Sequence, residues 1–392
     1  MKLLRVFAQE LCKRVRENNN GMADSFFARH SAAKRRSMSL KKIRKNIDLI
    51  DHRILTLLND RAKLSLEVKK FKPGASHEIY VPHREAEILN SLGRKNRGPF
   101  PAGSLKSVYR EIFSASRALQ APLRIAYWGP EGSFTHLAAQ EHFGSSVKFV
   151  NSRTISDIFE EIDSGRSDFG VVPIENSTEG AVNYTLDMFV DSPLSICAEI
   201  YLKIAHNLLS NESSIKKIKK LFTGLQPLAQ SRKWVEEYLP SSEIIEVSTT
   251  AEAARLAAKT KGGAAIANTL AAEIYGLGIL ARNIGDISNN ITRFMVIGKR
   301  TAERTGSDKT SVLCSIKDKV GALYTMLMPF KKNRINLTSI ESRPSRKKAW
   351  EYYFFIDMQG HREDKSVKKA LAELSDECQY FKILGSYPAE KY

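Results

Sequence analysis

The chain of 392 residues is 42% hydrophobic and 27% charged, a composition typical of folded proteins and a length sufficient for two to four domains. It contains no uncharged apolar run of about 18 residues, which excludes a membrane-spanning helix. Four scattered cysteines without CxxC spacing and eight histidines without HxxxH or HExxH spacing exclude a disulfide framework and a metal site, and favour a cytoplasmic protein with reduced thiols.

The net charge of +18 belongs mostly to the N-terminal third of the chain. Residues 1–120 hold 26 Lys and Arg against 11 Asp and Glu, and such a basic region attracts nucleic acid, anionic membranes or a small polyanionic substrate. Residues 1–38 lack clear periodicity, so we expect a basic extension without regular structure. The alternatives for this segment are a transit peptide and an upstream start codon, with Met22 or Met38 as the true start.

A long amphipathic helix is predicted over residues 40–71, where apolar residues recur three and four positions apart. Pro73-Gly74 ends it. Further helices are expected from about Pro82 to Ser91 and from about Ser104 to Gln120. Three helices cannot bury so long an apolar seam by themselves. We therefore expect an intertwined homodimer or a higher homo-oligomer.

Arg61 interrupts the apolar seam with a charge that is costly to bury unless it is paired. Lys72 follows 11 residues later, about 20° from the same face and about 16 Å away, so the two cations can converge on one ligand. Arg44 lies about 26 Å from Arg61 on another face, which places it in a partner chain's site if it serves one. Pairing of Arg61 with Asp60 or Glu67 is the alternative. Buried cations on helices suit a small dianion better than a nucleic-acid duplex.

Beyond Pro122 the pattern changes to alternating apolar strands and helices, which predicts an α/β sheet covered on both faces. Ala251–Lys259 is one of the predicted helices. The strand candidates are Arg124–Trp128, Phe169–Pro173, Ile196–Leu209, Ile244–Val247, Ala264–Ala267 and Phe294–Ile297.

Two polar segments follow predicted strands of this region. Gly129–His136 is Gly-rich and suited to binding an anion through backbone N–H groups, although it matches neither a P-loop nor a Rossmann loop. Val172–Ser177 ends a strand in polar residues, a common place for ligand contacts. Taken singly, each segment is also consistent with ordinary turn chemistry.

The C-terminal part of the chain forms a separate unit after a polar linker at residues 302–308. Its strands are predicted at 310–316, 335–342, 351–358 and 381–387, and its helices at 322–331 and 366–374. The order strand–helix–strand–strand–helix–strand is that of a ferredoxin-like α+β fold.

Residues 40–120 resemble the all-helical chorismate mutase domain through IDLIDHRILTLLNDRAKLSLEVKKFK, VPHREAEIL and EIFSASRALQ. The resemblance implies a three-helix domain at residues 39–121 that rearranges chorismate to prephenate without a cofactor. It implies catalytic roles for Lys72 and Gln120, as donors to the breaking ether oxygen, and for Glu85, which holds the ring hydroxyl. Val81 departs from the pattern, because some members carry an acid there. The implied substrate-binding residues are Arg44, donated to the partner's site, Arg61, Arg84 and Ser116.

Residues 123–300 resemble prephenate dehydratase through RIAYWGPEGSFTHLAA, VVPIENSTEGAV, LQPLAQ, STTAEAARLAA, AAIAN and NITRFMVIG. The resemblance implies a domain at residues 122–301 made of two α/β subdomains, with the active site in the cleft between them. Thr292 is the implied catalytic residue, because its hydroxyl can help hydroxide leave, and Arg293 is the implied ligand of a substrate carboxylate. Gly224 stands where the family often has His, so no role for that histidine is transferred. The other implied pocket residues are Glu175, Asn176, Thr178, Thr223, Gln226, Thr249 and Phe294.

Residues 309–388 resemble an amino-acid-binding ACT domain through Gly321-Ala-Leu323 and Glu341-Ser-Arg-Pro344. The resemblance implies phenylalanine as an allosteric ligand that binds the low-activity state of the dehydratase more tightly. A purely structural dimer module is the alternative. The implied allosteric residues are Gly321, Ala322, Leu323, Glu341, Ser342, Arg343 and Pro344.

Together these resemblances imply a multidomain, cofactor-free enzyme of the bifunctional chorismate mutase/prephenate dehydratase family, which forms phenylpyruvate under feedback inhibition by phenylalanine. We expect no nucleic-acid, membrane or metal partner and a cytoplasmic location. Two other functions stay open. One is a phenylalanine-responsive regulatory protein whose cleft binds without turnover, and the other is nucleic-acid binding through residues 1–45, which predicts steep salt dependence. Dimer against tetramer, and arogenate as an additional substrate, also stay open.

Overall fold

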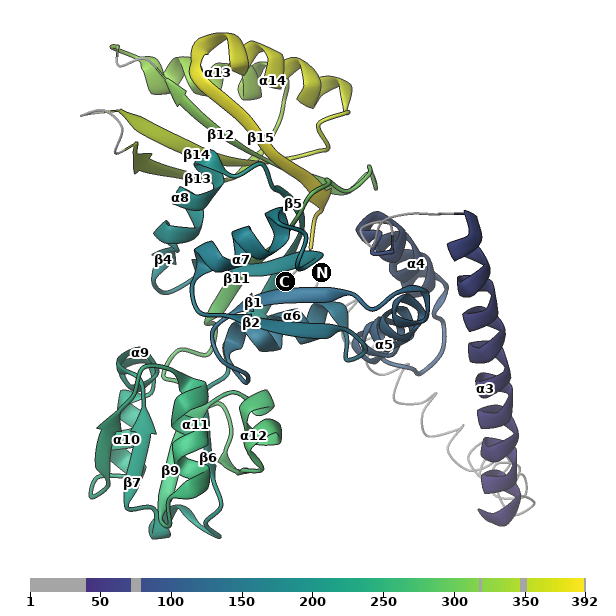
Figure 1. Cartoon of the computed structure of the whole chain (residues 1–392), viewed down its shortest axis with the longest axis vertical. Helices are drawn as coiled ribbons and strands as arrows, with labels where there is room; N and C mark the ends of the chain where they lie inside the picture. Colours follow the sequence, from purple (N-terminus) through teal and green to yellow (C-terminus); the bar gives the residue numbers. More distant parts are fainter. Residues whose placement is uncertain (1–39, 72–78, 317–318, 346–350, 391–392) are drawn as a thin grey trace, which may run out of the picture. The chain divides into compact units, whose positions relative to one another are not determined.

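The computed structural model describes residues 40–71, 79–316, 319–345 and 351–390 (Figure 1). The chain falls into two compact units, residues 1–64 and residues 65–392. The predicted N-terminal extension at 1–38 and the predicted catalytic Lys72 lie outside the described residues.

A single long helix, α3 (Leu40–Phe71), carries the apolar seam predicted from the sequence. It begins in the first unit and ends in the second. Its large apolar side chains are exposed, with Leu57 at 68% and Ile50 at 54%. An exposed apolar stripe of this length is unfavourable in water. The exposed seam of α3 is the feature from which we predicted association with a second chain.

Two further helices, α4 (Pro82–Lys95) and α5 (Ala102–Gln120), follow in the second unit. The predicted end of α4 at Ser91 is wrong, because Gly93 lies inside the helix, where glycine is tolerated at a cost of about 1 kcal/mol. Helix α5 buries polar side chains as well as Phe113. Ser114 accepts a hydrogen bond from the backbone N–H of Ser146 at 3.0 Å, so α5 packs against the α/β region that follows.

A mixed sheet in the order β2-β1-β3-β11-β5 forms the first half of the α/β region, with the short β4 paired to β3. Strands β1, β2 and β3 run parallel, while β11 runs antiparallel between β3 and β5. Helix α6 (Phe134–Phe143) packs on one face, and α7 (Ile155–Asp163) and α8 (Asn183–Asp191) pack on the other. The strands are β1 (Arg124–Trp128), β2 (Lys148–Ser152), β3 (Phe169–Asn176), β4 (Gly180–Ala181), β5 (Ser195–Lys203) and β11 (Ile291–Gly298).

A second sheet in the order β10-β6-β9-β7-β8 forms the other half. Buried alanines of α11 pack on β9 and leave little space between helix and sheet. The strands are β6 (Asn207–Ser210), β7 (Lys220–Thr223), β8 (Glu243–Glu246), β9 (Gly263–Ala267) and β10 (Gly278–Ala281). The helices are η2 (Ile215–Lys217), α9 (Leu225–Gln230), α10 (Arg232–Tyr238), α11 (Thr250–Lys259) and α12 (Thr269–Tyr275).

The predicted strand Ile196–Leu209 is wrong as a single element. Its first part is β5 in the first sheet and its last part is β6 in the second sheet, and the chain crosses between them at residues 204–206. No glycine or proline marks this crossing, so the continuous apolar run concealed it. The chain returns to the first sheet between β10 and β11. These two crossings divide the region into the two α/β subdomains expected from the sequence.

The C-terminal domain confirms the predicted ferredoxin-like order. Its antiparallel sheet has the order β13-β14-β12-β15. The two helices cover one face of this sheet. The other face joins the core under α7 and α8, where Leu313, Tyr353 and Phe355 pack with residues of the first α/β subdomain. The elements are β12 (Asp308–Ile316), α13 (Ala322–Lys332), β13 (Leu337–Pro344), β14 (Tyr352–Gln359), α14 (Lys365–Glu377) and β15 (Cys378–Pro388).

Candidate functional site

A cavity of about 980 Å³ lies between the two α/β subdomains. Its walls come from both sheets and from the loops at the ends of their strands. The predicted anion-binding loop contributes Gly129, Pro130 and Ser133, and Ser133 caps α6 by accepting a hydrogen bond from the backbone N–H of His136 at 3.2 Å. The positive end of the α6 dipole therefore lies at this cavity.

Asn176 and Thr292 form a cross-strand pair at the wall of the cavity. They are directly opposite each other in the β3–β11 register. Asn176 Nδ2 donates to Thr292 Oγ1 at 2.7 Å, and the exposed fraction of Thr292 is only 8%. Because Oγ1 accepts this bond, the hydroxyl hydrogen of Thr292 is available to a ligand in the cavity.

A chain of hydrogen bonds continues from Asn176 through side chains that the sequence analysis missed. Asn176 Nδ2 also donates to Asn290 Oδ1 at 2.9 Å, and Asn290 Nδ2 donates to Gln230 Oε1 at 3.1 Å. His206 Nε2 lies 2.7 Å from the same Gln230 oxygen. Since that oxygen is an acceptor, His206 carries its hydrogen on Nε2. Asn290 was detectable, because it lies two residues before Thr292 and so on the same side of the strand.

Burial keeps His206 in its neutral form. Desolvation lowers the pKa of the imidazole, and the hydrogen bond to Gln230 opposes this only in part. The ring of Phe134 packs edge-on against it, with the centroids 5.6 Å apart. A neutral histidine fixed in this way orients Gln230, and through Gln230 the amides that position Thr292.

The remaining predicted dehydratase residues divide between the cavity wall and its surroundings. Gln226, Thr249 and Phe294 line the cavity. Thr178 lies beside it, and its hydroxyl donates to Asn176 Oδ1 at 2.6 Å. Thr223 does not line it, because its side chain is buried at 1% exposure and its hydroxyl donates to the backbone of Gly224. Gly224 itself forms part of the wall.

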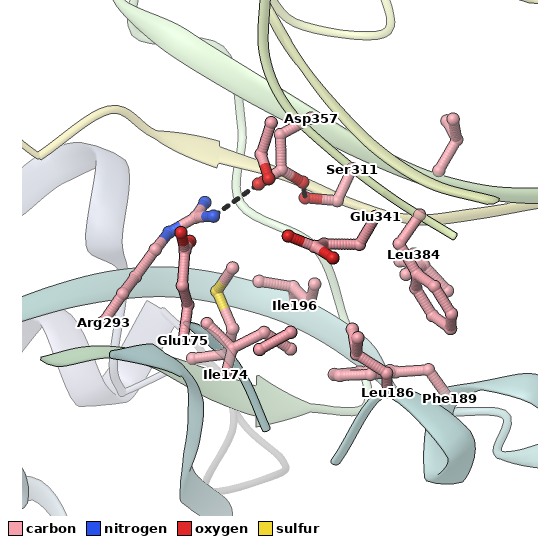
Figure 2. Close-up of a pocket in the computed structure, with 15 residues that line it drawn as sticks. Ile174, Glu175, Leu186, Phe189, Ile196, Arg293, Ser311, Glu341, Asp357 and Leu384 are labelled. Carbon is pink, nitrogen blue, oxygen red and sulfur yellow. Dashed lines mark hydrogen bonds and ion pairs between the residues drawn. The ribbon is translucent and has the colours of Figure 1, made fainter. Parts of the chain in front are cut away.

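Arg293 and Glu175 line a different, smaller cavity (Figure 2), on the opposite face of the sheet from Thr292 and Asn176. Successive side chains of a strand alternate between faces, so the neighbours of the cross-strand pair Thr292–Asn176 point away from the cleft. The expectation that Arg293 binds a substrate carboxylate beside Thr292 therefore disagrees with this geometry. The same holds for the expectation that Glu175 lines the dehydratase pocket.

The Arg293 guanidinium is bound by residues of the C-terminal domain and of β5. It lies 2.8 Å from Glu199 Oε2 and 2.5 Å from Asp357 Oδ2, and it donates to the Tyr387 hydroxyl at 3.1 Å. Burial alone works against the charged form, but the neighbouring carboxylates and phenols outweigh it and raise the pKa of Arg293 above its ordinary value. Lys309 completes the group at 2.9 Å from Glu199 Oε1.

Arg153, which the sequence analysis did not select, lines the cavity as an exposed cation. It lies directly after β2, a strand that was also missed because its sequence, KFVNS, contains few apolar residues. A guanidinium at this place can pair with an anionic group of a ligand.

The predicted mutase residues that the structure describes lie on α3, α4 and α5. Arg44 and Arg61 are on α3 in the first unit. In the second unit, Gln120 Nε2 donates to Ser65 Oγ at 2.7 Å, and the Ser116 hydroxyl donates to the backbone of its own helix at 2.6 Å. Ser65 Oγ in turn donates to the backbone oxygen of Ser116 at 3.4 Å, and the expectation that Ser116 and Gln120 face one pocket stays a prediction.

Glu85 and Arg84 have different surroundings on α4. Glu85 forms an ion pair with Arg117, a side chain that is only 4% exposed. Arg117 also donates to the backbone oxygen of Phe143 at 2.6 Å, and so links the predicted mutase residue to the first α/β subdomain. Arg84 forms an exposed pair with Glu87 at 3.0 Å.

The predicted allosteric residues lie at the start of α13 and along β13. Gly321 has φ of 79° before α13, a left-handed conformation that favours glycine, and Leu323 is exposed on that helix. Along β13, burial alternates. Glu341 lines a small cavity with Arg293, and Arg343 pairs with Asp187 of α8 at 3.0 Å. Ser342 and Pro344 are exposed.

Within residues 40–71, 79–316, 319–345 and 351–390, no group of three or more His, Cys, Asp and Glu side chains is arranged to hold a metal ion. In the same described part of the chain, no helix combines the length and apolar character needed to cross a membrane.

The sequence matches three family models in succession: chorismate mutase type II over residues 43–121, prephenate dehydratase over residues 125–302 and the ACT domain over residues 310–376. A bifunctional chorismate mutase/prephenate dehydratase of Aquifex aeolicus is 49% identical over 353 residues, which cover 89% of this chain and 98% of the relative. One from Stutzerimonas stutzeri is 44% identical over 355 residues, covering 89% and 97%. Among solved structures, prephenate dehydratase in complex with L-Phe from Arthrobacter aurescens is 34% identical with a TM-score of 0.63, covering 68% of this chain and 90% of that one.

Proposed function

The chain belongs to the bifunctional chorismate mutase/prephenate dehydratase family, and we propose that it converts chorismate to prephenate and prephenate to phenylpyruvate in the cytoplasm. The observation that carries the second activity is the Asn176–Thr292 pair at the wall of the cleft between the α/β subdomains. Thr292 is the residue that the sequence resemblance makes catalytic.

The dehydratase reaction breaks two bonds of prephenate and completes an aromatic ring. The bond to the ring carboxylate breaks and releases carbon dioxide, its electron pair enters the ring, and the ring hydroxyl leaves as hydroxide. In our proposal Thr292 donates a hydrogen bond from its hydroxyl to the leaving oxygen and so stabilises its developing negative charge. Asn176, held by Asn290, fixes the direction of that hydrogen, because its amide occupies Thr292 Oγ1 as an acceptor. Aromatisation supplies the driving force.

Substrate carboxylates are held by cations and dipoles of the cleft itself. We assign this role to Arg153 and to the N-terminal end of α6, because both lie at the cavity and both favour an anion. Gln226 and Thr249 add hydrogen-bonding groups to the same wall. We do not assign this role to Arg293, because its guanidinium pairs with Glu199 and Asp357.

The mutase reaction requires a site that folds the chorismate dianion into a compact conformer. In our proposal, Arg61 and the partner's Arg44 bind the carboxylates of chorismate. Lys72 and Gln120 stabilise the ether oxygen, and Ser116 and Glu85 complete the pocket. A partner chain is needed for this site, so we propose a homodimer or higher homo-oligomer.

Regulation is the last part of the proposal. Phenylalanine bound near Gly321 and Glu341 lowers the dehydratase rate.

A time course with chorismate as the only substrate tests both activities. Purified full-length protein is incubated with chorismate, and chorismate, prephenate and phenylpyruvate are followed by chromatography. We expect phenylpyruvate from the parent protein and accumulation of prephenate with Thr292→Ala. Thr292→Ser, which keeps the hydroxyl, is the matched control and should retain much of the second activity.

A different outcome of this time course would contradict each proposed activity. Prephenate accumulation with the parent protein contradicts the dehydratase activity. Untouched chorismate together with consumption of added prephenate contradicts the mutase activity. If neither substrate reacts while phenylalanine still binds, the chain is a phenylalanine-responsive binding protein instead of an enzyme.

A further inference from the structure

A buried cluster of charges joins the first α/β subdomain to the C-terminal domain. Its members, called the Arg293 cluster below, are Arg293 on β11, Glu199 on β5, Lys309 on β12 and Asp357 on β14. The exposed fractions of the Arg293 and Glu199 side chains are 7% and 0%. Charges this deeply buried are stable only with their partners in place, so the cluster is sensitive to any change in the position of the C-terminal sheet.

The Arg293 cluster lies on the opposite face of β11 from Thr292, the proposed catalytic residue. Arg293 follows Thr292 in β11, and the β3–β11 register pairs Thr292 with Asn176 and Arg293 with Glu175. A β-strand transmits a displacement of one side chain to its neighbour, because both are fixed to the same hydrogen-bonded backbone. The place where Arg293 is held therefore sets where the Thr292 hydroxyl lies in the cleft.

The partner of Arg293 in the C-terminal domain is linked to the predicted phenylalanine motif. Asp357 pairs in register with Ser339 of β13, and Glu341 follows two residues later on the same face of that strand. Ser339, Glu341, Asp357 and Arg293 all line one cavity of about 30 Å³ (Figure 2). In Figure 2 the Glu341 and Asp357 carboxylates point toward the side of the cavity that holds the Arg293 guanidinium.

We propose that Arg293 is a positioning residue through which the C-terminal domain sets the geometry of Thr292, and that phenylalanine inhibits the dehydratase by changing the hold of Asp357 on Arg293. This inference rests on the proposed dehydratase and its inhibition by phenylalanine. Phenylalanine bound at the motif displaces β13, and β13 carries Asp357 with it through their register. Arg293 then moves with Asp357, and Thr292 loses its alignment.

A second ion pair crosses the same domain boundary and provides a competing route. Arg343 Nη2 lies 3.0 and 3.1 Å from the two carboxylate oxygens of Asp187 on α8. This pair includes a residue of the predicted motif but has no contact with β11 among the described interactions. A neutral contact, from the Tyr380 hydroxyl to the backbone oxygen of Val190 at 2.8 Å, crosses nearby and serves as a control.

The first experiment separates binding of phenylalanine from its effect. In the full-length protein, Asp357→Asn removes the charge that holds Arg293 and keeps the shape of the side chain. We expect kcat for prephenate to be lower than in the parent even without phenylalanine, because Arg293 has lost its charged partner. Phenylalanine should bind with an affinity within about threefold of the parent by calorimetry, while its further inhibition of the variant's own rate falls from the roughly 5–150-fold range of allosteric effects to less than about twofold. Ser311→Ala, which removes the hydroxyl that donates to Asp357, is the milder variant if Asp357→Asn does not fold, and should weaken inhibition in part.

The controls decide between the two routes. Tyr380→Phe should bind phenylalanine and be inhibited like the parent. If Asp357→Asn is inhibited like the parent, or if Asp187→Asn abolishes inhibition while phenylalanine still binds, the proposal is overturned. A parent protein that converts prephenate but ignores phenylalanine contradicts the proposed feedback itself, and the inference falls with it. If phenylalanine inhibits the parent and inhibits Asp357→Asn equally, only the inference about Arg293 is overturned, and the proposed feedback stands.

A second experiment separates positioning from substrate binding. Arg293→Lys keeps the charge but loses the planar group that reaches Glu199, Asp357 and Tyr387 together. We expect kcat for prephenate to fall roughly 10–100-fold, as for a misplaced catalytic group, with KM within about threefold and the mutase rate unchanged. A large increase in KM at constant kcat would instead make Arg293 a substrate ligand.

Discussion

Asn176 and Thr292 face each other across β3 and β11, with Asn176 Nδ2 2.7 Å from Thr292 Oγ1. The amide occupies the oxygen as an acceptor and so directs the threonine hydrogen toward the cleft. The orientation of Asn176 is itself fixed by Asn290 at 2.9 Å. The reactive hydroxyl is thus held by a series of neutral side chains, and each link in this series is accessible to mutation.

Replacing Asn176 by alanine should weaken the second activity without affecting the first. Loss of one directing hydrogen bond in the transition state costs about 1–3 kcal/mol, so we expect kcat for prephenate to fall roughly 5–150-fold. The chorismate mutase rate should stay the same, because Asn176 lies in another domain. Steady-state kinetics with each substrate in turn checks both statements. A mutase rate that falls in parallel would indicate global damage to the protein instead.

Replacing Arg153 by glutamine should raise KM for prephenate about tenfold or more, since a hydrogen bond to a charged group contributes about 1.5–3 kcal/mol. Arg166, which pairs with Glu161 at 2.7 Å on the surface, is the matched control, and Arg166→Gln should leave KM unchanged. If Arg153→Gln leaves KM unchanged while Arg293→Lys raises it, the carboxylate ligand lies on the other face of β11 and the assignment made here is wrong.

The pair formed by Arg117 and Glu85 should stabilise the second unit strongly. The Arg117 side chain is 4% exposed, and removal of one partner of a buried pair costs about 3–5 kcal/mol. We therefore expect Arg117→Ala to lower Tm and the urea midpoint clearly. The exposed pair of Arg84 and Glu87 should contribute only about 0–1 kcal/mol, so Arg84→Ala should keep its stability and lose mutase activity. Equal destabilisation by the two variants would contradict the difference in burial.

His142 should make the protein less stable in acid. Burial, together with the cations Arg117, Lys106 and Arg110, lowers the pKa of His142 to about 3. Its ring accepts a hydrogen bond from Tyr80 at 2.5 Å, which requires the neutral form. Between pH 6.5 and about 3 the unfolded chain binds a proton at this residue that the folded chain excludes. Stability is then fully present above pH 6.5 and falls as the pH decreases, by at most about 1.4 kcal/mol per pH unit.

Replacement of His142 by glutamine should flatten this pH dependence. Glutamine cannot take up the proton, so the free energy of unfolding, measured by urea denaturation between pH 7 and pH 4, should fall less steeply with acid than in the parent. His52, which is exposed on α3, provides the matched substitution, and His52→Gln should leave the slope unchanged. An identical slope in His142→Gln and parent would mean that other groups cause the acid sensitivity.

The sequence predicted best those elements whose pattern is local. The three-and-four spacing from Leu40 to Phe71 corresponds to α3 residue for residue, and Arg124–Trp128 is β1. Strands such as β2 (KFVNS) and β7 (KLFT) escaped prediction because they are short and contain lysine or asparagine beside few apolar residues. Their strand conformation is fixed by the neighbouring strands and not by their own composition.

Local sequence pattern was also insufficient to predict which side chains the candidate site brings together. The resemblance placed Thr292 and Asn176 in one pocket, and both side chains line the cleft, while their roles stay predictions. Arg293 was placed with them because the motif was treated as one unit, although the two-residue period of a strand sends neighbours to opposite faces. His206 and Gln230 belong to segments far apart in the chain, and only the folded structure brings their side chains together.

The core beneath α7 and α8 has a consequence for how the protein melts. Leu313, Tyr353, Phe355 and Leu384 of the C-terminal domain share this core with Ile174 of β3 and Phe189 of α8. A chain ending at residue 301 loses the side chains that the C-terminal domain adds to this core, together with the partners Lys309 and Asp357 of Glu199 and Arg293. The dehydratase and ACT segments, distinct in sequence, therefore behave as one cooperative folding unit, and a single calorimetric transition is expected to cover both.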